Sequence, residues 1–137
     1  MGNDMNRSGY DYDCEDNWQM IRWRGMVASA TRGRRGQSLL IAMRDALDAM
    51  TEKRLIAHEL VSCDGVCALG ALGQAKSIDI TQLDPEDYAS VAATFDIAEP
   101  LAREIVYEND ECGLWRETPE HRWARMRDWV EKQIAKP

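Results

Sequence analysis

The sequence predicts an α+β fold, with about five helices packed around one two-stranded antiparallel β-hairpin near residues 55–69. Three observations predict it. Apolar residues recur at helical spacing in several segments. A single Asp64-Gly65 pair separates two short aliphatic runs, which is the strongest short-range signal of a hairpin. The chain has 137 residues, 45% of them hydrophobic, which suffices for one core.

The chain divides into an arm and a body. Residues 1–15 are polar and lack periodicity, so we expect a polar N-terminal arm there and a single globular domain over residues 16–137.

Capping residues and apolar spacing predict the helices. We expect helices over residues 17–31, 38–50 and 119–135, a short helix of small residues over 68–75, and helix starts at Asp84 and Asp96 in a segment that ends near Asn109. The expected buried face of the first helix consists of Trp18, Ile21, Gly25 and Ala28.

Two short strands complete the prediction. We expect them near residues 55–62 and 66–69, with Asp64 and Gly65 at the centre of the turn, because a type I′ turn needs positive φ at both central residues. Cys63 and Cys67 would then lie on opposite faces of the hairpin, so we expect neither a metal site nor a cofactor.

Charge is distributed unevenly along the chain. The net charge is −7, but residues 17–36 contain five arginines and no acid, whereas residues 79–111 contain ten acids and one base. No apolar run reaches the roughly 18 residues of a membrane span, and the N-terminus does not resemble a secretion signal. We therefore expect no membrane association and a cytoplasmic location. We also expect no direct binding of nucleic acid, since the overall field repels polyanions.

The acidic segment supplies the first candidate site. Glu104, Glu108 and Glu111 are spaced as one helix face, and Glu99 and Asp110 lie beside them in the sequence. Folding alone does not explain so many like charges. We expect these five residues to bind a partner protein that carries a basic surface.

The basic segment supplies an alternative site. Gly33-Arg34-Arg35-Gly36 stands between two predicted helices, and the order of elements resembles that of KH domains without their first strand. In such domains the glycines of this loop let a nucleic-acid backbone come close, and basic residues meet its phosphates. Arg32 and the four loop residues would then bind a single strand.

Two parts of the sequence resemble known proteins. Residues 66–72, 108–110 and 118–120 resemble a pattern in small uncharacterised proteins of phages and prophages, and residues 29–37 are similar to a phage-borne family of about this length. These families have no settled activity, so no site residue is carried over.

The expected function follows from charge and resemblance together. No segment has a catalytic signature, and neither histidine lies in a recognisable motif, so we expect a protein that is not an enzyme. We expect an accessory protein of a phage or prophage that binds and inhibits a host protein in the bacterial cytoplasm. In its most concrete form it would be an anti-CRISPR inhibitor of a nucleic-acid-binding complex. The oligomeric state stays open.

Overall fold

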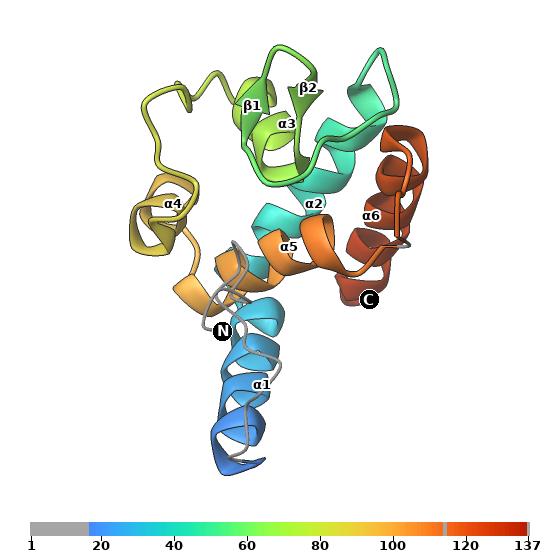
Figure 1. Ribbon diagram of the computed structural model, residues 1–137. Helices are drawn as coiled ribbons and strands as arrows, with labels where there is room; N and C mark the ends of the chain where they lie inside the picture. Colours follow the sequence, from blue (N-terminus) through green and yellow to red (C-terminus); the bar gives the residue numbers. More distant parts are fainter. Residues whose placement is uncertain (1–16, 114, 137) are drawn as a thin grey trace, which may run out of the picture.

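In the computed structural model, which describes residues 17–113 and 115–136, six helices surround one short hairpin (Figure 1). The α+β prediction is therefore confirmed. The elements are α1 (Asn17–Arg32), α2 (Arg34–Ala49), β1 (Val61–Ser62), β2 (Gly65–Val66), α3 (Ala68–Ala75), α4 (Tyr88–Phe95), α5 (Glu99–Glu111) and α6 (Pro119–Gln133). The predicted arm at 1–15 lies outside the described residues. None of the described helices is long and apolar enough to cross a membrane.

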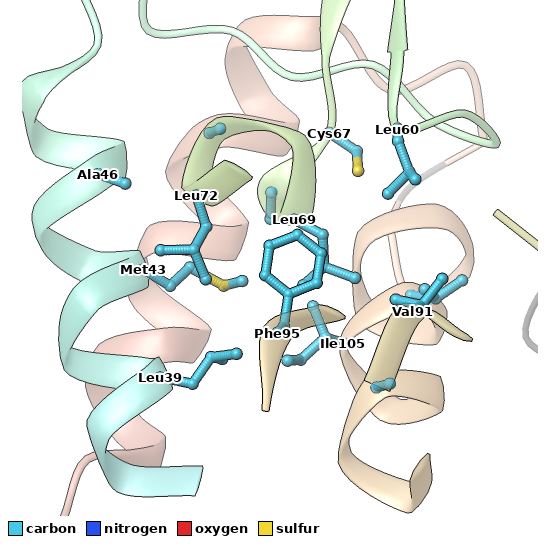
Figure 2. Packing of buried hydrophobic residues seen from close by; sticks show 14 of the residues in the cluster. Leu39, Met43, Ala46, Leu60, Cys67, Leu69, Leu72, Val91, Phe95 and Ile105 are labelled. Atoms are coloured by element: carbon cyan, nitrogen blue, oxygen red, sulfur yellow. The ribbon is translucent and has the colours of Figure 1, made fainter. Parts of the chain in front are cut away.

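Helix α2 forms the middle of the core. Leu40, Met43 and Leu47 are fully buried along one side of it, as their spacing in the sequence predicts. Figure 2 shows Leu39, Met43 and Ala46 of α2 directed toward residues of α3, α4 and α5. Met126 and Val130 of α6 are also fully buried, so the core joins helices from both halves of the chain.

A tight corner connects α1 and α2. The predicted helix start at Ser38 is wrong, because α2 begins at Arg34 with Gly33 as its N-cap. Gly36 packs against the backbone of α1, where an added Cβ would lie 2.0 Å from the carbonyl oxygen of Ala30. The amide of Gln37 closes the corner by donating to the carbonyls of Thr31 and Gln133, which ties α1 to the end of α6.

The hairpin is confirmed, but its register differs by one residue from the prediction. Ser62 pairs with Gly65, so Cys63 and Asp64 are the central residues of the turn. Gly65 has a φ of +136°, a conformation that residues with a side chain rarely adopt. The glycine is needed directly after the turn and not within it.

The predicted strand over 55–62 is mostly wrong. Only Val61 and Ser62 are strand residues, and the segment before them is irregular. Leu55 donates its backbone N–H to the carbonyl of Pro119, and Ile56 donates to that of Val66. His58 has a φ of +72°, which interrupts any continuous strand.

Two predicted helix caps are also wrong. Helix α4 is capped by Asp87, whose carboxylate accepts from the backbone N–H of Ser90, while Asp84 accepts from the N–H of Glu86 in the preceding turn. Asp96 ends α4 in the left-handed conformation instead of starting α5. Aspartate fits this position because its short polar side chain tolerates positive φ.

The predicted buried face of α1 is largely exposed. The side that packs on the body contains Val27 and Thr31, which are 7% and 8% exposed. Trp18 and Ile21 are 72% and 61% exposed, and the position where Gly25 would carry a Cβ meets nothing within 4 Å. Figure 1 shows the first half of α1 extending beyond the other helices, so these residues have no core to enter.

The corner gives a prediction about two helical glycines. We expect Gly36→Ala to lower the free energy of unfolding by about 3 kcal/mol, because the new methyl group meets rigid backbone. Gly25→Ala is the matched control, and we expect it to raise that free energy by about 0.5–1 kcal/mol through helix propensity alone. Urea denaturation followed by circular dichroism measures both; equal effects of the two variants would contradict the close contact at Gly36.

Candidate functional site

The predicted face of Glu104, Glu108 and Glu111 is not an exposed face. Glu104 is only 6% exposed and lies 3.5 Å from Arg24 of α1. Glu108 is half-buried, and burial together with the neighbouring charge of Glu104 raises the pKa of its carboxyl. Glu111 is also half-buried. These three carboxylates therefore do not form a solvent-exposed face of α5.

The other two predicted partner-binding residues have structural contacts as well. Glu99 lies 3.2 Å from Arg103, one helical turn further along α5. The side chain of Asp110 is fully buried, and it accepts the backbone N–H of His58 at 3.0 Å. These carboxylates hold other parts of this chain in place, which accounts for them without a partner.

The alternative site does not have the geometry of a KH loop. Arg34, Arg35 and Gly36 form the first turn of α2, and only Gly33 separates the two helices. Gly36 is buried against α1, so a phosphate cannot approach its backbone. Arg32, Arg34 and Arg35 are exposed, and Arg35 lies 3.3 Å from Asp96. Binding of nucleic acid through these arginines stays a prediction, but the clamp itself is absent.

The exposed carboxylates gather elsewhere, in the loop between α3 and α4. We call residues 77–87 the acidic loop. It contains Asp79, Asp84, Glu86 and Asp87, all exposed, and no basic residue. None of the ion pairs within the described part of the chain involves these four. The acidic loop is longer than the usual connection of about 4–6 residues.

Hydrogen bonds hold three carboxylates of the acidic loop, and in one of them Asp84 accepts from the backbone N–H of Glu86 at 2.9 Å. Asp79 accepts from the backbone N–H and the hydroxyl of Thr81, at 3.1 and 2.6 Å. Asp87 accepts from the N–H and the hydroxyl of Ser90. The hydrogen bonds from the Thr81 and Ser90 side chains lower the pKa of both aspartates, and the bonds from the backbone N–H groups of the same residues lower it further. The loop therefore presents oriented charges at neutral and mildly acidic pH.

A second polar cluster surrounds Glu117. This carboxylate, with its side chain only 2% exposed, lies 2.7 Å from Arg125 Nε, 3.3 Å from Arg122 Nε and 2.5 Å from His121 Nδ1. Arg125 also donates to the carbonyl of Glu108, and Arg122 donates to that of Leu55. The cluster thus joins the end of α5, the start of α6 and the segment before the hairpin.

The thiols and histidines do not form a catalytic pair in the described contacts. Burial, followed by the charge of Glu108, raises the pKa of Cys112 to about 12, so this thiol is not an activated nucleophile. His58 lies 3.7 Å from Asp110, and His121 contacts Glu117. Neither histidine approaches a serine or cysteine in any hydrogen bond or ion pair of the described chain.

The two cysteines of the hairpin are separated by burial. Cys63 is exposed in the turn, whereas Cys67 is buried at the start of α3, where its sulfur accepts the N–H of Gly70. Among residues 17–113 and 115–136, no three His, Cys, Asp or Glu side chains gather as a metal ion would require.

An open cleft of about 330 Å³ lies between the hairpin and the end of α2. Its charged residues are Glu52, Arg54 and Asp64, of mixed sign, and Glu52 lies 4.0 Å from Arg54. No histidine is among the residues that line the cleft.

The acidic segment is evident in the sequence, but most of its exposed charges lie in the acidic loop and not on α5, where they were expected. The signal for the loop was present in Asp84-Pro85, because Pro and Asp together favour turns. No protein-family model matches this chain, and searches of curated proteins and solved structures found no match either.

The burial of Glu104 gives a prediction about charge reversal at this position. We expect Glu104→Lys to lower the free energy of unfolding by about 3 kcal/mol, because a buried cation would face Arg24. Asp45→Lys, at an exposed position of α2, is the control and should change it by less than about 0.5 kcal/mol. Thermal denaturation measures both, and a stable Glu104→Lys protein would contradict the burial of this carboxylate.

Glu117 gives a prediction about pH. Burial alone would raise its pKa, but hydrogen bonds from Arg125 and His121 outweigh burial and lower the pKa below the ordinary value of 4.5. The carboxylate therefore stabilises the fold above pH 4.5, and this contribution is lost as the pH falls through the lowered pKa. We expect Glu117→Gln to be destabilised at pH 7 by about 3 kcal/mol, with the difference from wild type shrinking in acid.

Urea titrations at a series of pH values test this expectation. Glu120→Gln changes an exposed glutamate three residues further along the chain, in the first turn of α6, and should follow the wild-type profile. A Glu117→Gln profile parallel to that of the wild type down to the acid limit would show that Glu117 does not titrate as its contacts require.

Proposed function

We propose that this chain is a non-catalytic accessory protein of a phage or prophage, which binds and inhibits a nucleic-acid-binding defence protein of the bacterial host. An anti-CRISPR inhibitor acting in the host cytoplasm is the most concrete form. The observation that supports this is the acidic loop, which contains four exposed carboxylates and no basic residue. The resemblance of residues 29–37 and 66–72 to phage proteins supports the origin.

The physical basis is competition for a basic groove. A groove that binds a nucleic acid carries Lys and Arg side chains spaced to meet phosphates. Asp79, Asp84 and Asp87 are held in place by hydrogen bonds, so they lose little conformational freedom on binding. Charge complementarity would speed association at low salt and lose strength as salt screens it.

The acidic loop fits this role better than the carboxylates of α5. Glu104 and Asp110 contact Arg24 and His58 of this chain, and releasing them would cost folding free energy. The four carboxylates of the acidic loop have no such cationic partner among the described residues. Burial of their charges against a partner therefore breaks no ion pair between residues of the described ranges.

The test removes charge without changing shape. In the loop variant, Asp79→Asn, Asp84→Asn, Glu86→Gln and Asp87→Asn bring the net charge from −7 to −3, while the amides retain the capping acceptors. In the control variant, Glu59→Gln, Asp64→Asn, Glu120→Gln and Asp128→Asn make the same change at exposed positions elsewhere. Both variants should fold as the wild type does.

Each immobilised protein is then used to capture proteins from bacterial lysate, with quantitative mass spectrometry as the readout. We expect wild type and control to retain nucleic-acid-binding proteins that added duplex DNA displaces, and the loop variant to lose them by at least about tenfold. Equal capture by the loop variant, or capture that DNA does not displace, would contradict the proposed function.

A further inference from the structure

We propose that the outer face of α1 binds single-stranded nucleic acid. We call Trp18, Arg22, Gly25, Ser29 and Arg32 the α1 face. Their spacing of four, three, four and three residues places them on one side of the helix, and all five are exposed. The α1 face runs for about 21 Å at 1.5 Å per residue. This surface is separate from the acidic loop, so the inference goes beyond the proposed function.

The charge on this surface favours a polyanion. Residues 17–36 contain five arginines and no acid. Arg24 and Arg35 are paired with Glu104 and Asp96. Arg22, Arg32 and Arg34, by contrast, take part in none of the ion pairs of the described chain, and all three are exposed. Arg22 and Arg32 on the α1 face, together with Arg34 in the adjoining first turn of α2, supply three guanidinium groups that would each neutralise a phosphate and release its counterions.

The shape of the α1 face suits a flexible strand. Trp18 is 72% exposed at one end, and an exposed indole is a platform on which bases stack. Gly25 and Ser29 have the smallest side chains of the α1 face, so its centre does not protrude from the helix. An added Cβ at Gly25 would meet nothing within 4 Å. A sugar-phosphate backbone can therefore approach the helix between Arg22 and Arg32. Ile21 and Met26, 61% and 50% exposed, flank the face where bases would turn inward.

The charge pattern also argues against a second copy of this chain as the occupant. Two α1 helices packed face to face would bring together arginines from both copies with no acid between them. Repulsion of this kind opposes helix pairing. A single strand of nucleic acid supplies instead one negative charge per nucleotide along the whole face.

The net charge of −7 does not exclude this binding. At physiological ionic strength the screening length is about 8 Å, which is shorter than the α1 face. A strand on the outer side of α1 therefore senses mainly the local arginines. Weak binding at high salt and clear binding at low salt is the expected behaviour.

The experiment measures fluorescence anisotropy of labelled oligo(dT) and oligo(rU), each about 20 nucleotides long, across a series of salt concentrations. We expect binding at low salt that weakens as salt rises. In the triple variant Arg22→Ala, Arg32→Ala, Arg34→Ala, binding should weaken by about 10- to 100-fold. The slope of log K against log salt should fall by about 2, since a single strand loses about 0.7 for each phosphate contact.

Two matched controls distinguish the α1 face from the rest of the surface. The triple variant Lys76→Ala, Arg116→Ala, Lys136→Ala gives the same net charge of −10 from other exposed positions and should bind as wild type does. Trp18→Ala should weaken binding about tenfold, whereas Trp115→Ala, at an indole 84% exposed, should not.

The inference is overturned if wild type does not bind at low salt, or if both triple variants lose affinity equally. A dimer seen by light scattering would also overturn the inference, if Ile21→Glu dissociates that dimer and added oligonucleotides do not. A second copy of the chain would then cover the α1 face. The loop variant serves as a further comparison, because it leaves every residue of the α1 face unchanged. If the loop variant no longer captures proteins from lysate but still binds the oligonucleotides, the two activities depend on different surfaces, and each proposal can fail without the other.

Discussion

The side chain of Asn109 holds three separate parts of the chain together. Its amide oxygen accepts the backbone N–H of Ala68 at the start of α3, and its nitrogen donates to the carbonyl of Ile56. The residue is 1% exposed, so each of these groups would be costly to leave without a partner. Residues 51–60 lie outside the two strands, and backbone partners such as Val66 and Pro119 satisfy only part of their polar groups. Side chains from α5 and α6 bond to the N–H of His58 and the carbonyls of Leu55 and Ile56. The position of the hairpin and of α3 depends on these bonds.

The same requirement explains where the acidic charges of α5 are used. Asp110 accepts the N–H of His58, and the carbonyl of Glu108 accepts from Arg125, which Glu117 holds in turn. Glu104, one turn before Glu108 on α5, lies 3.5 Å from Arg24 of α1. A run of charges that looks uniform in the sequence is thus divided by the fold. One part is buried and joins elements of the chain, and the other part, in the acidic loop, is exposed to solvent.

Local patterns predicted the elements whose structure depends on neighbours in sequence. Helix α6 begins at Pro119 with Thr118 as its cap, as expected, and the buried stripe of α2 follows its helical spacing. The prediction failed where distant contacts decide. The segment near Leu55 has the composition of a strand but bonds to the carbonyl of Pro119. The side of α1 that contains Trp18, Ile21 and Gly25 was expected to be buried, because periodicity shows that a helix has two sides, but not which side meets the body.

The candidate sites follow the same division. Gly33 to Gly36 resembled a binding loop in sequence, yet Gly36 is required by the close approach of α1 and α2. One sequence does not distinguish a glycine needed for packing from a glycine needed to bind a ligand. In the structure, the close approach of Gly36 to the carbonyl of Ala30 shows that this glycine is needed for packing. Charge adds a further distinction. The net charge describes the whole chain, whereas a ligand senses the potential within about one screening length of its own contacts. A chain of −7 can therefore carry both an acidic loop that suits a basic groove and an arginine-bearing helix that suits a polyanion, provided that the fold keeps the two surfaces apart.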